Sequence, residues 1–175
     1  MTLKVILQRF ALPGFIVSLY YFWKYGCLIS PRAEVEVGTD LRIGRGVRVG
    51  SYTKIKAGDG WLTIGAGTSI GSGCSLSSGK QGVKIGEHCL IGPNVTILGS
   101  NYRYDRLDKL FVEQEMIAKG VRIGDNVWVG AGVVILDGSD IGSGSILTPN
   151  SVVSGTIQAN VVVQGTPGKI IFERR

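Results

Sequence analysis

The sequence predicts an all-β chain wound as a parallel β-helix, and three observations support this fold class. First, an aliphatic residue returns every six positions over most of the chain. Second, glycine often follows that aliphatic residue, and a smaller residue lies four positions after it. Third, a period of six fits neither an amphipathic helix nor an alternating strand, but it is typical of hexapeptide solenoids. Three hexads then make one triangular coil, and stacked coils share a core.

Two sets of side chains are predicted to face this core. The aliphatic set is Val37, Ile43, Val49, Ile55, Ile64, Ile70, Leu76, Ile85, Ile91, Ile97, Ile123, Val129, Ile135, Ile141, Leu147 and Val153. The smaller set is Leu41, Val47, Thr53, Thr68, Cys74, Cys89, Val95, Val127, Val133, Ser139, Ser145 and Ser151. We attribute the glycines that follow the aliphatic residues to corner dihedrals that a Cβ would strain. A core of this size requires neither disulfide nor metal.

Length and composition agree with one repeat domain. The chain has 175 residues and a formal net charge of +6, and its basic residues are scattered rather than blocked. This pattern indicates a weak preference for anionic partners and no nucleic-acid partner. The three cysteines have neither CxxC nor Cys/His ligand spacing. Cys74 and Cys89 fall on inward positions, which favours small buried thiols and a reducing, cytoplasmic compartment.

The first part of the chain differs from the repeats. Residues 1–34 are predicted to form an N-terminal apolar helical segment, and residues 35–175 the β-helix. Pro13 and Gly26 indicate where the helix begins and ends. Its uncharged run ends at Trp23 and has 14 residues, which is too few to span a membrane.

Two interpretations of this segment stay open. It caps the open end of the β-helix or packs in an oligomer, or it is an interfacial anchor. Its aromatic side chains and its purely basic charges, Lys4, Arg9 and Lys24, favour the anchor. Residues 1–30 would then make a peripheral contact with the inner face of a membrane, and they would dock on it rather than span it.

Three irregularities of the repeat fall on the same side of successive coils. They are the short insertions 57–61 and 77–82 and the long loop 98–120. We expect the two insertions to stack beneath the loop and to form one wall of a groove. Long loops in compact domains are usually functional or disordered, and the mixture of aromatic, charged and apolar residues here favours an ordered loop.

Several stretches resemble the hexapeptide-repeat acyltransferases, and among them the bacterial sugar and polysaccharide O-acetyltransferases. They are GSNYRYD at 99–105, VRIGDNVWVGAG at 121–132, GTPGK at 165–169, and the stretch from LPGF at 12–15 to PRAE at 31–34. The resemblance implies a left-handed β-helix and a homotrimer with acetyl-CoA in the groove between neighbouring subunits. It also implies transfer of the acetyl group to a hydroxyl of a sugar or surface-glycan intermediate, in the cytoplasm.

The expected reaction needs a group that removes the hydroxyl proton. In this family a loop histidine does so, in a pattern like Ser-x-His-x-Tyr-Asp, and Tyr102 stands at that position here. A phenol has a pKa of about 10 and is about one part in a thousand ionised at pH 7. Tyr102 is therefore the candidate catalytic residue. Asn101, Tyr104 and Asp105 beside it are the candidate acceptor-binding residues.

The one histidine of the chain, His88, is a second and weaker candidate for the base. It lies three residues after Ile85, at an outward position where the repeat accepts almost any polar residue. A single histidine also argues against the γ-class carbonic anhydrases, which share this helix but bind zinc through three histidines. No metal site is predicted.

The resemblance also implies a donor site. Its candidates, carried over by position, are Trp128, Ala131, Pro149, Ser154 and Lys169. In the family the first four line the pantetheine channel, and the basic residue lies near the adenosine phosphates, where a point charge suffices.

A non-catalytic family member that binds a ligand or partner stays open as the alternative, because Tyr102 replaces the loop histidine. The sequence leaves undecided the acceptor sugar, the choice between O- and N-acetylation, and the acyl length.

Overall fold

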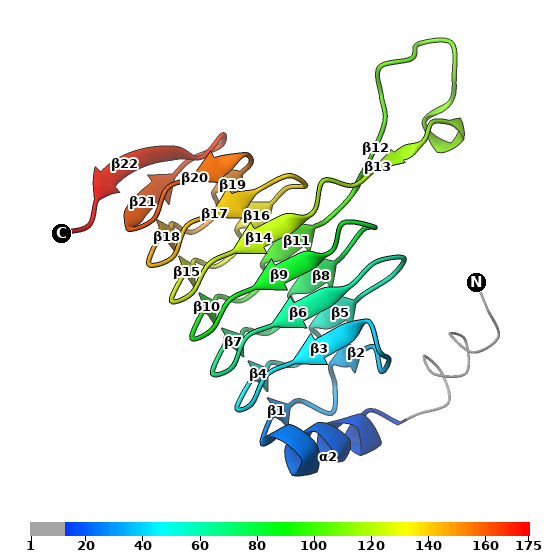
Figure 1. The fold of residues 1–175 in the computed structure, drawn as a ribbon, viewed down its shortest axis with the longest axis vertical. Coiled ribbons are helices and arrows are strands. Elements are labelled where there is room, and N and C mark those ends of the chain that lie inside the picture. Colours follow the sequence, from blue (N-terminus) through cyan, green and yellow to red (C-terminus); the bar gives the residue numbers. More distant parts are fainter. Residues whose placement is uncertain (1–12) are drawn as a thin grey trace.

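The computed structural model describes residues 13–175, which wind into a left-handed parallel β-helix. Figure 1 shows helix α2 at one end of the stack, the C-terminal strands at the other, and a hairpin that projects from the side. The predicted fold class is thereby confirmed.

Three parallel sheets form the faces of the triangular solenoid. Sheet A comprises β1 (Leu28–Ile29), β4 (Arg48–Val49), β7 (Ser69–Ile70), β10 (Leu90–Ile91), β15 (Trp128–Val129), β18 (Ile146–Leu147) and β21 (Val161–Gln164), with β22 (Lys169–Glu173) added antiparallel. Sheet B comprises β2 (Glu34–Val35), β5 (Lys54–Lys56), β8 (Ser75–Ser77), β11 (Thr96–Leu98), β16 (Val134–Ile135) and β19 (Val152–Val153). Sheet C comprises β3 (Leu41–Ile43), β6 (Leu62–Ile64), β9 (Val83–Ile85), β14 (Val121–Ile123), β17 (Asp140–Ile141) and β20 (Thr156–Ile157). One strand of each sheet makes a coil, and residues 13–175 contain six coils.

The inward side chains stack in register from coil to coil. On sheet B, Ile55 lies opposite Leu76, Leu76 opposite Ile97, and Ile97 opposite Ile135, and all four are fully buried. The predicted core sets are confirmed with one exception at the first coil. Val37 is only partly buried, because Val35 takes the inward position opposite Ile55.

The small inward residues also satisfy backbone carbonyls at the corners. Thr53 donates from Oγ1 to the carbonyl of Gly71 at 2.7 Å, one coil further on. Cys74 and Cys89 donate from Sγ in the same way, each at 3.1 Å, to glycine carbonyls of the next coil. The position therefore accepts a short side chain with a donor as well as valine, and burial raises the pKa of both thiols.

The glycines that follow the aliphatic residues have a different role from the one predicted. The structure places no positive φ at Gly65 or Gly86. A Cβ on Gly65 would instead come within 2.4 Å of the carbonyl carbon of Gly86 in the coil above. Close approach of stacked backbones, and not an unusual dihedral, excludes a side chain here.

The left-handed corner dihedral belongs to the residue just before each small inward residue, with the exception of Asp40 before Leu41. Glycine and asparagine fill this position most often, as at Gly73 and Asn94. Tyr52 and His88 also adopt it, with φ of 61° and 55°.

Helix α2 (Gly14–Tyr25) begins after Pro13 and ends at Gly26, as predicted. Gly26 has a φ of 64° and its N–H caps the last turn. Val17 and Tyr21 pack on the first coil, so the helix covers the N-terminal end of the core. The first coil begins at Leu28, seven residues ahead of the predicted boundary at residue 35.

Candidate functional site

The long loop is an ordered hairpin between β11 and β14, at the corner where sheet B passes to sheet C. Strand β12 (Asn101–Tyr102) pairs antiparallel with β13 (Met116–Ile117), so that Tyr102 lies opposite Met116. A further bond from the Arg103 N–H to the Glu115 carbonyl, at 3.0 Å, extends this ladder. The hairpin thus holds Tyr102 on a paired strand rather than on a free loop.

A buried polar side chain bonds several parts of the hairpin tip together. Gln114, which follows the short helix η1 (Phe111–Glu113), is only 7% exposed. Its amide donates to the carbonyls of Arg106 and Lys109, at 3.0 and 3.3 Å, and accepts the Arg106 N–H at 3.2 Å. Hydrogen bonds to the buried Gln114 amide therefore stabilise the tip, where a larger domain would use apolar packing.

The base of the hairpin is fixed by Asp137 from the next coil. Its Oδ1 accepts the N–H groups of Lys119 and Gly120, each at 2.8 Å. The two short insertions stack beneath it, as predicted, since Gly60 lies against Gly79 and Gly79 lies against Gly99. Asp137 and the two stacked insertions therefore support the base of the hairpin.

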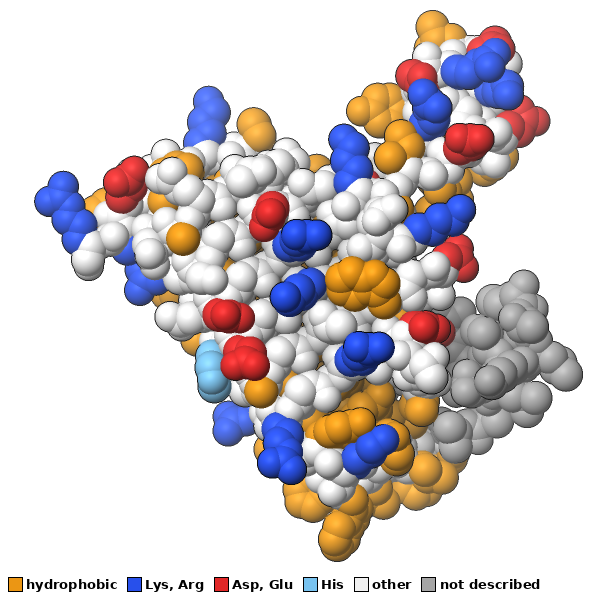
Figure 2. Space-filling model, in the orientation of Figure 1, with side chains coloured by type: hydrophobic (Ala, Val, Ile, Leu, Met, Phe, Trp, Pro, Cys, Tyr) orange, Lys and Arg blue, Asp and Glu red, His pale blue; other side chains and the backbone are white. Residues whose placement is uncertain are grey.

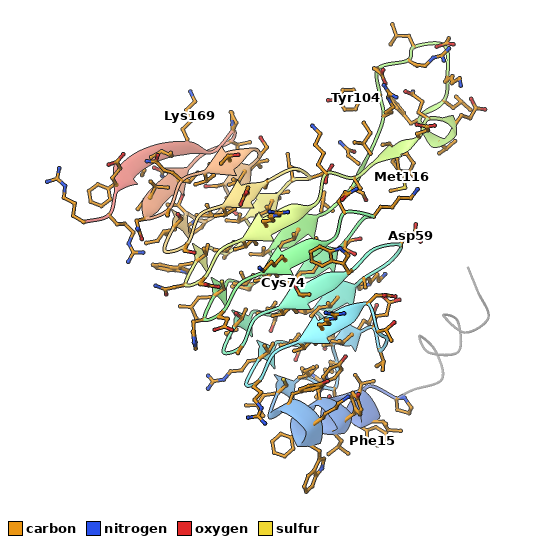
Figure 3. All side chains as sticks on the ribbon, viewed as in Figure 1. Phe15, Asp59, Cys74, Tyr104, Met116 and Lys169 are labelled. Carbon is orange, nitrogen blue, oxygen red and sulfur yellow. The ribbon has the colours of Figure 1, made fainter. Side chains whose placement is uncertain are left out.

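A cavity of about 310 Å³ opens between the hairpin and the last coils. It is lined by Leu98, Ser100, Asn101, Tyr102, Tyr104, Ile117, Lys119, Leu136, Asp137 and Ser154. Figure 3 shows Tyr104 pointing from the hairpin toward the C-terminal coils. Hydroxyls, one carboxylate and one ammonium over an apolar floor suit a small polar ligand such as a sugar.

The predicted acceptor residues divide at this cavity. Tyr102, Asn101 and Tyr104 line it, and Tyr102 is 46% exposed. Asp105 lies outside the lining and pairs with Arg103 at 3.1 Å on the exposed side of the hairpin. The phenol of Tyr102 is thus available to a ligand.

His88 lies at a different corner from the cavity, in the turn from β9 to β10. Its ring covers Gly67 of the coil below, where a Cβ would meet Nδ1 at 2.5 Å. Its exposed side chain and left-handed backbone are those of a corner residue. A single chain does not bring His88 to Tyr102.

The predicted donor residues are also spread over the chain. Ser154 lines the cavity, whereas Ala131 and Pro149 stack at the corner between sheets A and B, where the Asn150 N–H donates to the Ala131 carbonyl at 2.9 Å. Lys169 begins β22 near the C-terminal end and is exposed (Figure 3).

Trp128 lies on the outer face of sheet A and is 54% exposed. It stacks in register between Leu90 and Ile146, and Val162 and Phe172 continue the same row. This apolar row faces away from the core. Within one chain it belongs to a different face from the cavity corner.

Sequence reasoning missed Lys119 and Asp137. Aligning the repeats on Ile97 and Ile135, which are paired in the structure, would have placed Asp137 at the same corner as the loop. In the sequence, the indication that Asp137 belongs to the site is its position at this corner, one coil after the loop insertion.

Residues 13–175 contain no cluster of His, Cys, Asp and Glu that could hold a metal ion. Among the helices that the structure describes, none has the length and apolarity to cross a membrane.

Known proteins provide an independent comparison. The family model for the bacterial transferase hexapeptide (six repeats) matches residues 120–155, and that for the hexapeptide repeat of succinyl-transferase matches residues 82–100. A probable acetyltransferase of Mycobacterium tuberculosis is 30% identical over 172 residues, which is 98% of this chain and 56% of that protein. The galactoside O-acetyltransferase of Escherichia coli is 38% identical over 91 residues, or 52% of this chain and 44% of that one. The chain thus spans about half the length of the curated relatives it matches.

Among solved structures, a variant of AntD, an N-acyltransferase from Bacillus cereus bound to dTDP and coenzyme A, superposes with a TM-score of 0.77. The alignment covers 90% of this chain and 88% of that one at 18% identity. At this identity the likeness shows a shared fold.

Proposed function

We propose that this chain, which belongs to the hexapeptide-repeat transferase family, moves an acetyl group from acetyl-CoA to a hydroxyl of a sugar or surface-glycan intermediate. The observation that carries the proposal is the cavity beneath the hairpin, at the place where the family-like residues Asn101 and Tyr104 meet the last coils. The relatives with acetyltransferase activity in their names support the reaction class. Polysaccharide biosynthesis is the process in which such a product belongs.

The chemistry assigns separate tasks to the residues of the cavity. The acceptor hydroxyl attacks the thioester carbonyl while its proton passes to a base, and the tetrahedral intermediate collapses as the C–S bond breaks and coenzyme A leaves as the thiol, having taken up that proton. The phenol of Tyr102 and the amide of Asn101 can orient the hydroxyl by hydrogen bonds, and the Lys119 ammonium can face developing negative charge. The carboxylate of Asp137 is already engaged by two backbone N–H groups, so its role is to hold the hairpin.

A homotrimer is part of this proposal, because it accounts for residues that a single chain leaves apart. Trp128 and the apolar row beside it are exposed on sheet A, and the hairpin exposes Leu107, Leu110 and Phe111. Contiguous exposed apolar surface of this kind marks an interaction site. A neighbouring subunit that covers the row with its hairpin would bring Trp128 to the cavity of that neighbour, with acetyl-CoA between them.

We place the reaction in the cytoplasm, at the inner face of the membrane. The three cysteines support this placement, since Cys27, Cys74 and Cys89 are all buried free thiols.

A second candidate function is supported by one specific observation. The residues that line the cavity include no histidine, and phenols replace the imidazole that the reaction would use at neutral pH. On this alternative the chain binds a glycan or a partner without acetylating it.

The proposal is tested by following coenzyme A release with a thiol reagent, using a panel of neutral sugars and one amino sugar as acceptors. Buried thiols keep the protein's own background low. We expect Tyr102→His to raise the rate by about 10²–10⁴-fold, because an imidazole accepts a proton near pH 7. Tyr102→Phe should lower the wild-type rate, and His88→Ala serves as the control that leaves the cavity unchanged.

The outcomes separate the two functions. Acetyl transfer that depends on residue 102 supports the enzyme. Activity with the amino sugar alone would change the proposal to N-acetylation, since an amine can attack before it loses its proton. Silence of all variants, with acetyl-CoA or sugar still bound, would establish the binding function instead. Light scattering on the same samples checks the trimer, and a monomer would remove Trp128 from the site.

A further inference from the structure

Helix α2 presents one continuous apolar face to solvent at the end of the solenoid. Its exposed large side chains are Phe15, Ile16, Leu19, Tyr20, Phe22 and Trp23. At 100° per residue these positions cover an arc of about 160° on one side of the helix. Val17 and Tyr21 lie on the opposite side and pack on the first coil. Figure 2 shows these hydrophobic side chains gathered at the α2 end of the molecule.

We call these six exposed side chains the apolar face of α2. The face contains more aromatic side chains than a cap over the first coil requires. The core contact is already made by Val17 and Tyr21. Trp23 is 82% exposed, and no described residue covers it. Isolated surface hydrophobics need no explanation, but six on one helix face mark a surface that meets another apolar phase.

The charges in this part of the sequence are basic, and Glu34 on β2, the strand that packs on α2, pairs with Lys54 at 3.5 Å. Residues 1–33 contain four basic residues and no acidic residue. Lys24 borders the face, where its Nζ donates to the Tyr20 hydroxyl at 2.8 Å and lies 5.1 Å from the centre of the Tyr25 ring. Arg45 and Arg48 are exposed on the adjoining coil, next to the C-terminal end of the helix and to Leu28.

We propose that this face docks on the surface of a bilayer that contains anionic phospholipids. Aromatic side chains flanked by Lys and Arg match the boundary between acyl chains and phosphate headgroups. With 12 residues, α2 is about 18 Å long, so it lies in the interface and does not cross it. The long axis of the solenoid then carries the hairpin and its cavity away from the lipid (Figure 1).

The same charges argue against a second copy of this chain as the occupant. In a two-fold contact each face would meet its own image, and the cations around the two faces would come together. Like charges placed opposite each other weaken such an interface, whereas they strengthen attraction to phosphate.

The proposal is tested by flotation of the full chain with vesicles of phosphatidylcholine alone and of an equimolar mixture with phosphatidylglycerol. We expect binding to the anionic vesicles that weakens as NaCl is raised, because salt screens the basic rim. Replacing two apolar anchors, in Phe15→Ser/Trp23→Ser, should reduce the bound fraction at least about tenfold. The control, Ile170→Ser/Ile171→Ser, removes two exposed apolar side chains from β22, at the opposite end of the solenoid from α2, and should float like the wild type.

Fluorescence locates the contact. The chain has three tryptophans, so Trp61→Phe/Trp128→Phe leaves Trp23 as the reporter. Its emission should shift to the blue with anionic vesicles and be quenched by lipids brominated on the acyl chains. Thermal melting and light scattering of each variant exclude unfolding as the cause. Equal flotation of the Phe15/Trp23 variant and the wild type would overturn the proposal. So would an α2 variant that changes only the oligomeric state while the wild type binds no vesicle.

Discussion

The coils and the hairpin use similar side chains in opposite ways. Ile97, in the fourth coil, is fully buried between Leu76 and Ile135. Ten residues later, Leu107 at the hairpin tip is completely exposed, and Leu110 is 67% exposed. Hydrophobicity alone therefore does not decide burial in this chain. The position within the six-residue repeat decides whether a side chain is buried. A segment that does not follow the repeat, such as the hairpin, has its apolar residues outside the core.

The two regions also differ in what holds them. Each coil bonds to its neighbours through continuous parallel ladders, such as Ile55 with Leu76 and Leu76 with Ile97. The hairpin depends on a short antiparallel ladder, on Gln114 at its tip and on Asp137 at its base. Its stability is thus concentrated in a few bonds and can be changed without changing the coils.

The largest expected effect on stability comes from a substitution in the core of the coils. Ile97→Ala should lower the free energy of unfolding by about 2–5 kcal/mol, since it leaves a cavity in the tightly stacked core. Leu107→Ala, the matched change on the hairpin, should alter the free energy of unfolding of a single chain by less than about 0.5 kcal/mol, and a larger loss would place Leu107 in the subunit contact of the proposed trimer. Denaturant melts measured by circular dichroism give both values. Equal losses would mean that the hairpin packs on something in solution that a single chain does not show.

A smaller effect should separate the hairpin from the coils. Asp137→Ala removes the acceptor of two backbone N–H groups, at a local cost of about 1–3 kcal/mol. Hydrogen exchange should then quicken over residues 99–120, and acetyl transfer should fall, while the melting of the coils changes little. Asp125→Ala is the control, because Asp125 accepts the Glu87 N–H at 2.8 Å at another corner, away from the hairpin. If both variants loosened the hairpin equally, Asp137 would have no special role there.

The smallest expected effect concerns His88, a corner residue of a coil, and tests whether the stability of a coil can change without a change in acetyl transfer. His88→Gly should raise stability by about 0.5–1 kcal/mol, because glycine relieves the left-handed backbone by more than its added unfolded-state entropy costs. Acetyl transfer should be unchanged. Gly65→Ala, in the same sheet corner region, should destabilise instead, since its Cβ would strike the backbone of Gly86. A loss of activity in His88→Gly would place the histidine in the site through a neighbouring subunit.

The coils could be predicted from the sequence because each position repeats the same physical requirement. The aliphatic and small positions were read correctly at nearly every repeat, and Pro13 and Gly26 marked the helix ends. The reason for the glycines was wrong, because a clash with the next coil depends on the stacking distance and not on local sequence. Val37 was chosen instead of Val35 because it lies six residues before Ile43, whereas the turn from Val35 to Leu41 is two residues longer than the matching turn from Ile135 to Ser139.

The candidate site could be predicted only in part. Tyr102, Asn101 and Tyr104 were found through their loop motif, and they do line the cavity. Lys119 and Asp137 are brought in by contacts between coils, which a linear reading does not order in space. Trp128 lies on another face of the same chain, so its place in the site rests on the proposed trimer, which no local pattern in the sequence indicates.

Stacked coils convert residue number into distance. Each coil adds one strand spacing, about 4.8 Å, along the solenoid axis. The hairpin leaves from the fourth coil and α2 packs on the first, so about 14 Å of rigid rise separates them. Inserting or deleting one whole coil between them would move the hairpin by a fixed step and leave the surroundings of both ends unchanged. The number of coils between α2 and the hairpin therefore sets the distance between them.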